Sequence, residues 1–239
     1  MIIAVEKTVS ELALEIPNAT RVFEKLGIDY CCGGGKSLEE ACAAARVPSD
    51  EVLNALAAAA QPGTPVEHDW PSELLADLVE HIIQTHHKYT REEIGRLQAL
   101  LVKVCSVHGR NHPELATIQE TFRGLSQELT MHMMKEEMVL FPYIVRMEEA
   151  VLQKEPVLPP PFGRVENPVR MMMEEHDSAG EALRAMRQAS RGYAVPDDGC
   201  VSYRTLYQAL EAFEADLHQH IHLENNILFP RAVKMEESH

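Results

Sequence analysis

The sequence predicts an all-α protein in which a small N-terminal helical domain precedes a duplicated antiparallel four-helix bundle. Three observations favour this fold class. Aromatic residues make up only 5% of the chain and β-branched runs are scarce, whereas leucine and alanine are plentiful, which favours helices. Two helix-capping patterns occur in the first 40 residues. The segment from His132 to Pro142 recurs, 88 residues later, as the segment from His220 to Pro230.

Residues 1–60 are expected to form the small domain, built from short helices. Thr8-Val9-Ser10-Glu11 and Ser37-Leu38-Glu39-Glu40 are capping boxes, and each opens an apolar helical stretch. Pro17 should stop the first helix, and Gly27 should end a second helix that begins near residue 18. Pro48 and the two residues after it open a last short helix.

Residues 61–70 are predicted to be a linker, because the prolines and glycine of 61–65 cannot continue a helix. The rest of the chain, 71–239, is predicted to be the four-helix bundle. A proline-rich stretch at 153–163 divides it into two helical hairpins. The four long helices are expected at roughly 71–106, 113–149, 166–191 and 200–236.

The repeat runs through both hairpins and continues past the prolines, where 145–149 matches 233–237. The first and third helices align at an offset of 89, which pairs His87 with His176. Each half therefore supplies one helix with an inward histidine and one with inward His-x3-Glu, because residues four apart share a helix face. The candidate metal ligands are His87, His132, Glu136, His176, His220 and Glu224.

Imidazoles and carboxylates facing the interior of a bundle indicate a metal site. Two metals with two histidines each, and both carboxylates bridging, have four protein donors apiece. A shared oxide or hydroxide makes five and leaves one open position, which favours a non-haem di-iron centre; zinc would be satisfied by four ligands without a bridge. The alternative, a metal-free bundle, would leave two uncompensated carboxylates in the core at considerable cost.

Several residues near these ligands have other expected roles. His218 and His222 should point away from His220, about 200° around the helix. Glu128, one turn before His132, and Glu175, beside His176, are candidates for supporting the ligands or lining an access route, unless they are ordinary exposed glutamates. The methionines around the second and third helices are expected to fill the core; they are Met131, Met133, Met134, Met138 and Met171 to Met173.

The overall charge of −15 argues against nucleic acid and against anionic membrane surfaces as partners. The N-terminus lacks the pattern of a signal peptide, and no run approaches the roughly 18 apolar residues of a membrane span. Five cysteines, an odd number, do not suggest a disulfide framework. We therefore expect a cytoplasmic protein with reduced thiols.

The predicted bundle resembles hemerythrin, with two departures from the oxygen-carrying members. Those place a second histidine four residues after the ligand of the third helix, where this chain has Gly180, and they end in His-x4-Asp rather than His-x3-Glu. Both departures are similar to the iron–sulfur cluster repair di-iron proteins. That family also carries an Asp-Tyr-Cys-Cys-Gly-Gly motif, here 29–34, and a terminal Leu-Glu-Asn-Asn-x-Leu-Phe-Pro, here 223–230.

This resemblance covers essentially the whole chain and implies that the six candidate ligands hold two oxo- or hydroxo-bridged irons. It also bears on Cys31 and Cys32. A vicinal disulfide would be strained, the glycines allow a close approach, and the helix beginning near Ser37 would favour thiolate. Two incidental thiols are the alternative. The resemblance favours a solvent-reachable dithiol that takes up iron or nitrosyl, or engages a client, whereas Cys42, Cys105 and Cys200 are expected to be structural.

By resemblance, the function is repair of iron–sulfur clusters damaged by nitric oxide or peroxide. The centre would release iron, Cys31 and Cys32 would transfer it, and damaged iron–sulfur proteins would be the partners; a homodimer is left open. One alternative is an enzyme that reduces NO to N₂O at the di-iron site. Another is reversible binding or sensing of O₂ or NO, although Gly180 speaks against an oxygen carrier.

Overall fold

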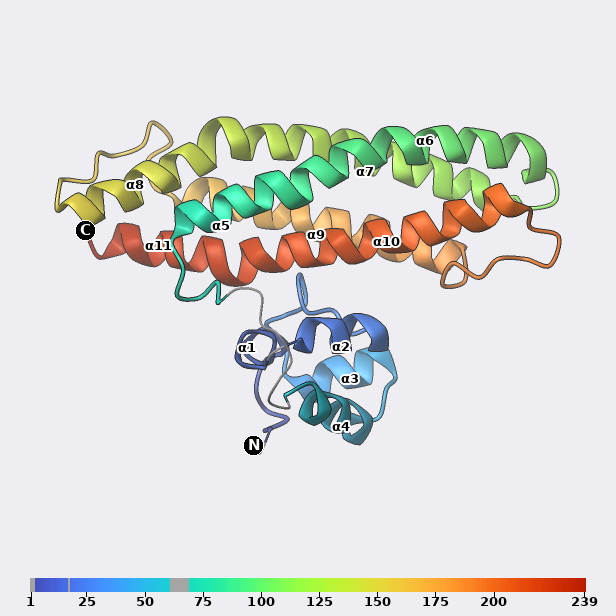
Figure 1. The fold of residues 1–239 in the computed structure, drawn as a ribbon, viewed down its shortest axis with the longest axis horizontal. Helices are drawn as coiled ribbons and strands as arrows, with labels where there is room; N and C mark the ends of the chain where they lie inside the picture. Colours follow the sequence, from blue (N-terminus) through green and yellow to red (C-terminus); the bar gives the residue numbers. More distant parts are fainter. Residues whose placement is uncertain (1–2, 17, 61–68) are drawn as a thin grey trace.

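The computed structural model describes residues 3–16, 18–60 and 69–239, and over these residues it confirms the predicted all-α fold (Figure 1). Pro17 and residues 61–68 of the predicted linker lie outside the described residues. The helices form a long bundle whose axis is horizontal in Figure 1, with a smaller group of short helices packed against the middle of one side.

The smaller group contains α1 (Val9–Glu15), α2 (Ala19–Leu26), α3 (Leu38–Ala45) and α4 (Ser49–Ala59). Both predicted capping boxes are formed: the Thr8 hydroxyl accepts from the Glu11 N–H at 3.2 Å while the Glu11 carboxylate accepts from the Thr8 N–H at 2.8 Å. Gly27 ends α2 at a φ of 67°, a left-handed conformation. The helices share an apolar core that includes Leu12, Phe23 and Leu56.

Three of the four bundle helices contain a π-helical turn. The first runs through α5 (Leu75–His81), η1 (Ile82–His87) and α6 (Lys88–His108). The second runs through α7 (Glu114–Lys135), η2 (Glu136–Leu140) and α8 (Phe141–Gln153). The third is α9 (Glu166–Ala189), and the fourth runs through α10 (Val201–Leu223), η3 (Glu224–Leu228) and α11 (Phe229–Glu237). None of these described helices has the length and apolar character needed to cross a bilayer.

The π-helical turns η2 and η3 follow from the two prolines of the repeat. Pro142 has no N–H, and in a regular α-helix its ring would clash with the carbonyl oxygen four residues earlier. The helix widens instead, and the Phe141 N–H donates to the carbonyl of Glu136, five residues back. Phe229, just before Pro230, does the same with Glu224. Each proline therefore sets the local geometry of a candidate ligand.

The tails of the repeat cap the other helices of the bundle. Glu148, at the end of the second helix, accepts from the N–H groups of Leu75 and Ala76 at 2.7 and 2.9 Å. Glu236, its counterpart 88 residues later, accepts from the N–H of Val165 at 3.0 Å. A carboxylate at a helix N-terminus satisfies free donors and the helix dipole together. The repeated Met-Glu-Glu tail thus fixes where the first and third helices begin.

Candidate metal centre

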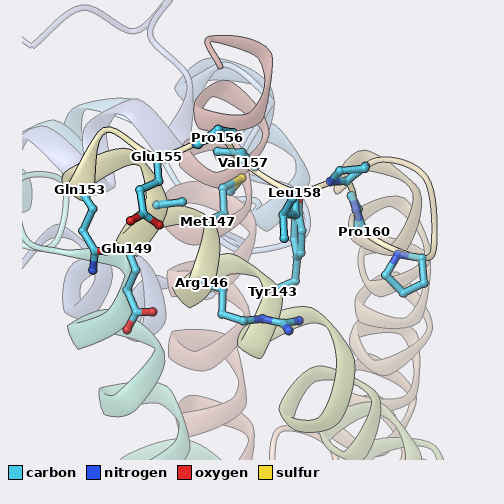
Figure 2. Close-up of a pocket in the computed structure, with 13 residues that line it drawn as sticks. Tyr143, Arg146, Met147, Glu149, Gln153, Glu155, Pro156, Val157, Leu158 and Pro160 are labelled. Atoms are coloured by element: carbon cyan, nitrogen blue, oxygen red, sulfur yellow. The ribbon is translucent and has the colours of Figure 1, made fainter.

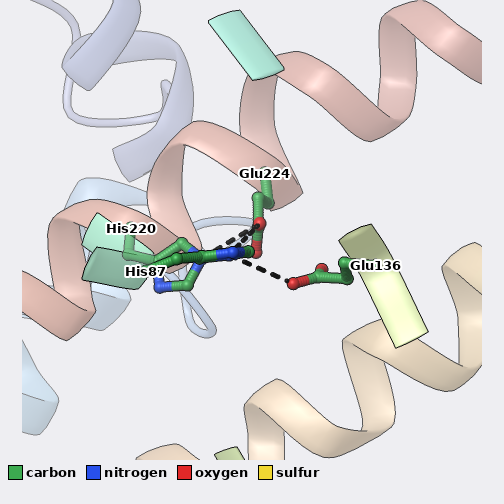
Figure 3. Close-up of side chains that lie close together, drawn as sticks. All are labelled: His87, Glu136, His220 and Glu224. Atoms are coloured by element: carbon green, nitrogen blue, oxygen red, sulfur yellow. Dashed lines mark hydrogen bonds and ion pairs between the residues drawn. The ribbon is translucent and has the colours of Figure 1, made fainter. Parts of the chain in front are cut away.

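The six candidate ligands converge in the interior of the bundle, all of them buried. Their donor atoms form two groups of four that share Glu136 and Glu224. In the first group, shown in Figure 3, His87 and His220 bring their Nε2 atoms within 3.1 Å of each other, and the His220 Nε2 lies 3.0 Å from Glu224. In the second group, the Nε2 atoms of His132 and His176 are 3.0 Å apart.

Each carboxylate directs one oxygen to each group. Glu136 Oε2 lies 3.4 Å from His87 Nε2, and its Oε1 lies 3.3 Å from His132 Nε2. Glu224 Oε1 faces the His87 and His220 imidazoles, whereas its Oε2 is 3.1 Å from His176 Nε2. Each group also draws one histidine from each half of the repeat, so neither hairpin could complete a group alone.

The residues present fit a cation. Both carboxylate oxygens of Glu136 and one of Glu224 are buried without a hydrogen-bond partner. A buried, unsatisfied carboxylate is costly unless something positive lies beside it. The four Nε2 atoms point inward with their Nδ1 atoms outward, which is the usual tautomer arrangement of metal-bound histidine. Imidazole with carboxylate is a donor set that suits iron.

Three of the four imidazoles are oriented by a second polar side chain. Glu137 lies 2.6 Å from His87 Nδ1 and is itself held by Arg91. Glu175 lies 2.8 Å from His132 Nδ1 and pairs with Lys135. Asn225 lies 2.8 Å from His176 Nδ1. Such partners fix the ring and raise its basicity.

The predicted neighbours of the ligands separate into two kinds. Glu175 is placed against His132, as described above. Glu128 is not brought to the centre: it is exposed, and its hydrogen bond comes from the Ser178 hydroxyl at 3.4 Å. Glu137 and Asn225 were missed by the sequence reasoning. Each directly follows a candidate ligand, Glu136 or Glu224, but that position alone does not indicate which histidine on another helix it contacts.

Aromatic packing around the centre follows the repeat as well. Phe141 stacks on the His87 ring, with centroids 5.7 Å apart, and Phe229 stacks on His176 at 6.0 Å. His220 differs from the other ligands, because its buried Nδ1 has no hydrogen-bond partner. The His86 ring stacks on it at 5.7 Å, and His86 Nδ1 contacts Asp216. The inward residue is thus His87, which the repeat alignment pairs with His176, and its neighbour His86 lies beside the candidate centre.

Without a metal, the buried histidines and carboxylates of the candidate centre shift one another's pKa values. Burial lowers the pKa of His132, but the carboxylates of Glu136, Glu224 and Glu175 outweigh burial and raise this pKa to about 9. Burial raises the pKa of Glu224, but His220 and His176 outweigh it and hold that pKa well below its usual value. Burial keeps the pKa of His220 lowered. The carboxylates are thus ionised and ready to bind a cation.

The cysteine turn lies directly against the bundle. The Asp29 carboxylate organises it by accepting from the N–H groups of Cys31 and Gly33, at 3.2 and 2.9 Å. Cys31 is only 5% exposed and belongs to the apolar core of the bundle. The Cys32 thiol beside it, together with burial, raises the pKa of Cys31. The expectation of a solvent-reachable thiolate is therefore wrong for Cys31, because burial disfavours the charged form; Cys32 is partly exposed.

Cys32 occupies the space left by Gly180. Its thiol donates to the backbone carbonyl of His176 at 3.4 Å, on the helix that carries this ligand. A Cβ atom at Gly180 would lie 3.3 Å from the Cys32 sulfur. Oxygen-carrying hemerythrins have a histidine at this position. Here the position is Gly180, and the cysteine turn packs over it.

His218 and His222 do point away from the centre, as expected, and they serve a second purpose. His218 Nδ1 lies 3.0 Å from Glu24 of α2. His222 packs edge-on against Tyr30, with ring centroids 5.4 Å apart. Burial lowers the pKa of His222 to about 4, so this ring is neutral. The outer face of α10 is therefore part of the surface on which the N-terminal helices rest (Figure 1).

The expectation that the methionines fill the core is wrong for most of them. Met133 and Met172 are buried. The others lie on the outer faces of the bundle, because they fall between the inward positions of their helices; they are Met131, Met134, Met138, Met171 and Met173. Cys200 was expected to be structural, but it is exposed at the start of α10.

A separate cavity of about 400 Å³ lies under the proline-rich connection (Figure 2). Tyr143, Met147 and the prolines of 156–161 line it. None of the six candidate metal ligands is among its lining residues. The candidate metal centre is instead a cluster of buried side chains.

Comparison with known proteins agrees with this geometry. The model of the hemerythrin HHE cation binding domain matches residues 78–232, and that of a domain of unknown function (DUF542) matches residues 5–60. An iron-sulfur cluster repair protein YtfE of Cronobacter sakazakii is 36% identical over 97% of this chain and 98% of its own length. A protein of the same name from Escherichia coli O81 is 36% identical over the same shares. Built on a cation-binding hemerythrin bundle with this N-terminal domain, the chain belongs to the YtfE family of iron-sulfur cluster repair proteins.

Proposed function

We propose that this protein repairs iron–sulfur clusters damaged by nitrosative or oxidative stress, and that it does so by donating iron. The observation that carries the proposal is the sharing of two buried carboxylates, Glu136 and Glu224, between two histidine pairs. The names of its relatives support repair over NO reduction and over reversible binding of O₂ or NO. Damaged iron–sulfur proteins are the proposed partners.

The proposed centre holds two non-haem irons. His87 and His220 would bind one iron, His132 and His176 the other, and both glutamates would bridge the pair with an oxide or hydroxide. When bound, such a pair supplies iron at an open coordination position and one-electron redox chemistry. Glu137, Glu175 and Asn225 hold three of the imidazoles in the orientation that binding requires.

Iron is the cargo in this proposal, and Cys32 is the proposed point of transfer. It is partly exposed, and its thiol contacts the backbone of His176. Cys31 lies 3.9 Å away, sulfur to sulfur, and is buried. We assign Cys31 to anchoring the turn and Cys32 to receiving the metal. We also propose that residues 1–60 and 71–239 form two domains, joined by a linker at 61–70. The free thiols of all five cysteines support a cytoplasmic location.

The test compares iron delivered by the protein with free iron. A dehydratase whose cluster has been damaged by NO is mixed with iron-loaded protein or with the same amount of ferrous salt, and recovery of its activity is followed anaerobically. We expect faster recovery with the protein. Equal rates would contradict the repair proposal, whatever the metal content of the protein.

Cysteine variants test the transfer step. Cys32→Ser should keep its iron and deliver it more slowly, because the ligands are untouched. Cys105→Ser is the matched control, because Cys105 lies far along α6 from the ligands and contacts the carbonyl of Leu115. Normal delivery by Cys32→Ser would show that this thiol is incidental.

A further inference from the structure

The connection from α6 to α7 and that from α9 to α10 lie at the same end of the bundle (Figure 1). They carry a second group of side chains that could bind a metal. One donor atom from each of His108, His112 and Asp198 lies within 4.8 Å of the others. The Cys200 sulfur lies 3.2 Å from His108 Nε2, but it is not within 4.8 Å of all three donors of this group. We propose a zinc-binding site here, in which His108, His112 and Asp198 are already grouped and Cys200 becomes the fourth ligand by a rotation of its side chain.

The site is separate from the centre described above. His108 is the last residue of α6 and His87 precedes its first, which places them about 30 Å apart along the helix at ~1.5 Å per residue. The two histidines come from the end of α6 and the connection to α7, whereas Asp198 and Cys200 come from the connection between α9 and α10. A metal here would tie the two halves of the duplicated bundle together.

Contacts around His112 favour a bound cation. Its Nδ1 lies 3.0 Å from Glu114, and its Nε2 lies 2.9 Å from Asp198 Oδ1. If Nδ1 donates its hydrogen to Glu114, the Nε2 lone pair faces another acceptor, so a proton or a metal ion must lie between them. Carboxylate, imidazole and metal in this order are the usual arrangement of a histidine ligand.

Both imidazoles are held by one buried ring. Tyr203 is fully buried, and its ring meets His108 and His112 edge-on, with centroids 5.3 and 5.4 Å apart.

The donor set selects zinc among the common metals. One thiolate, two imidazoles and one carboxylate make four ligands of the types that Zn²⁺ takes tetrahedrally. Bonds of about 2.0–2.3 Å place neighbouring donors roughly 3.3–3.7 Å apart. The contacts of 2.9 and 3.2 Å already come close to that spacing. Four protein ligands fill the coordination sphere, which makes this a structural site rather than a catalytic one.

The experiment measures zinc and iron in the same samples of full-length protein. Iron-loaded protein is incubated with zinc, passed through a desalting column and analysed by mass spectrometry for both metals. We expect about one zinc per chain with no loss of iron. Cys200→Ser and His112→Ala should lose this zinc and keep the iron, whereas Cys105→Ser, one turn before His108 on the same helix, should keep both. Glu114→Gln should bind zinc about 10- to 100-fold more weakly.

Cobalt gives a second readout that does not depend on stability. Protein loaded with Co²⁺ should show thiolate-to-cobalt charge-transfer absorption, and Cys200→Ser should lose that absorption. Zinc content that is the same in wild type, Cys200→Ser and His112→Ala would overturn the proposal. So would an absence of zinc in all of them, because it would mean that a protonated His112 bridges the two carboxylates without a metal.

Discussion

Glu136 and Glu224 are the residues on which the metal centre depends most, because each faces both histidine pairs. Their side chains are completely buried, and Glu136 has no hydrogen-bond partner for either oxygen. Replacing one of them should therefore disturb both groups of donors, whereas replacing one histidine removes a donor from one group. The convergence of the six candidate ligands could be predicted from the sequence, because the helical period and the repeat restrict which residues face inward. Glu137 and Asn225 could not, because their direction depends on π-helical turns.

Glu224→Leu should lose most of the bound iron and lower the unfolding temperature of the protein purified with iron. The reason is that ligation stabilises only the folded state. Iron analysis and calorimetry measure the two effects. Glu128→Gln is the control; because Glu128 is exposed and away from the ligands, its stability should stay within about 0.5 kcal/mol of wild type. Full iron content in Glu224→Leu would disprove the ligand assignment.

The stability of the metal-free protein should fall as the pH rises from about 6.5 to about 9. His132 has its pKa raised from 6.5 to about 9 in the folded state, so its stabilising charge is fully present below 6.5 and is lost as the pH passes through 9. The loss should be on the order of 2 kcal/mol. Chemical denaturation of chelator-treated protein across this range measures it.

His132→Gln cannot titrate and is the matched variant for this pH effect. Its stability should change less over the same range, and iron-loaded wild type should also be less sensitive because bound histidine is deprotonated. A metal-free wild type that responds to pH in the same way as His132→Gln would contradict the role of His132.

At the scale of the helices, the repeat has a structural purpose that the alignment alone does not reveal. The Leu-Phe-Pro segments create the π-helical turns, and the Met-Glu-Glu tails supply the carboxylates that cap α5 and α9. Helix positions could be predicted, since they follow from periodicity and caps. The partners of Glu148 and Glu236 could not, because they are 73 and 71 residues away in the chain.

Glu148→Ala should destabilise the bundle by about 1–2 kcal/mol, because two N–H groups at the start of α5 lose their acceptor. Urea denaturation of the metal-loaded protein measures the change in the free energy of unfolding. Glu149→Ala is the adjacent control: Glu149 is exposed, so its replacement should have little effect. Equal stability of the two variants would mean that Glu148 does not act as a cap.

At the scale of the whole molecule, the cysteine turn joins the N-terminal helices to the bundle. Tyr30, Cys31 and Cys32 all contact bundle residues, and the Asn226 amide donates to the Tyr30 carbonyl at 3.1 Å. The sequence marked this turn as functional, but its burial could not be predicted. Nothing in a Cys-Cys-Gly-Gly-Gly turn indicates which surface of another domain will cover it.

Gly180→Leu should push the cysteine turn off the bundle, because even a Cβ at that position lies 3.3 Å from the Cys32 sulfur. The expected result is faster alkylation of Cys31 and Cys32 with the helix content unchanged. Gly95→Leu is the control, since a Cβ at Gly95 meets nothing within 4 Å. Thiol modification followed by peptide mass spectrometry identifies the cysteines. Unchanged alkylation of both would show that Gly180 does not seat the turn.

The two halves of the bundle are related by the repeat, but packing of the N-terminal helices makes their outer faces different. His222 and Asn226, which contact Tyr30, correspond across the 88-residue repeat to Met134 and Met138. Those two methionines are 43% and 72% exposed. The duplicated halves thus present two equivalent outer faces beside the candidate metal centre. The N-terminal helices cover the face at His222 and Asn226, whereas the corresponding face at Met134 and Met138 is exposed to solvent.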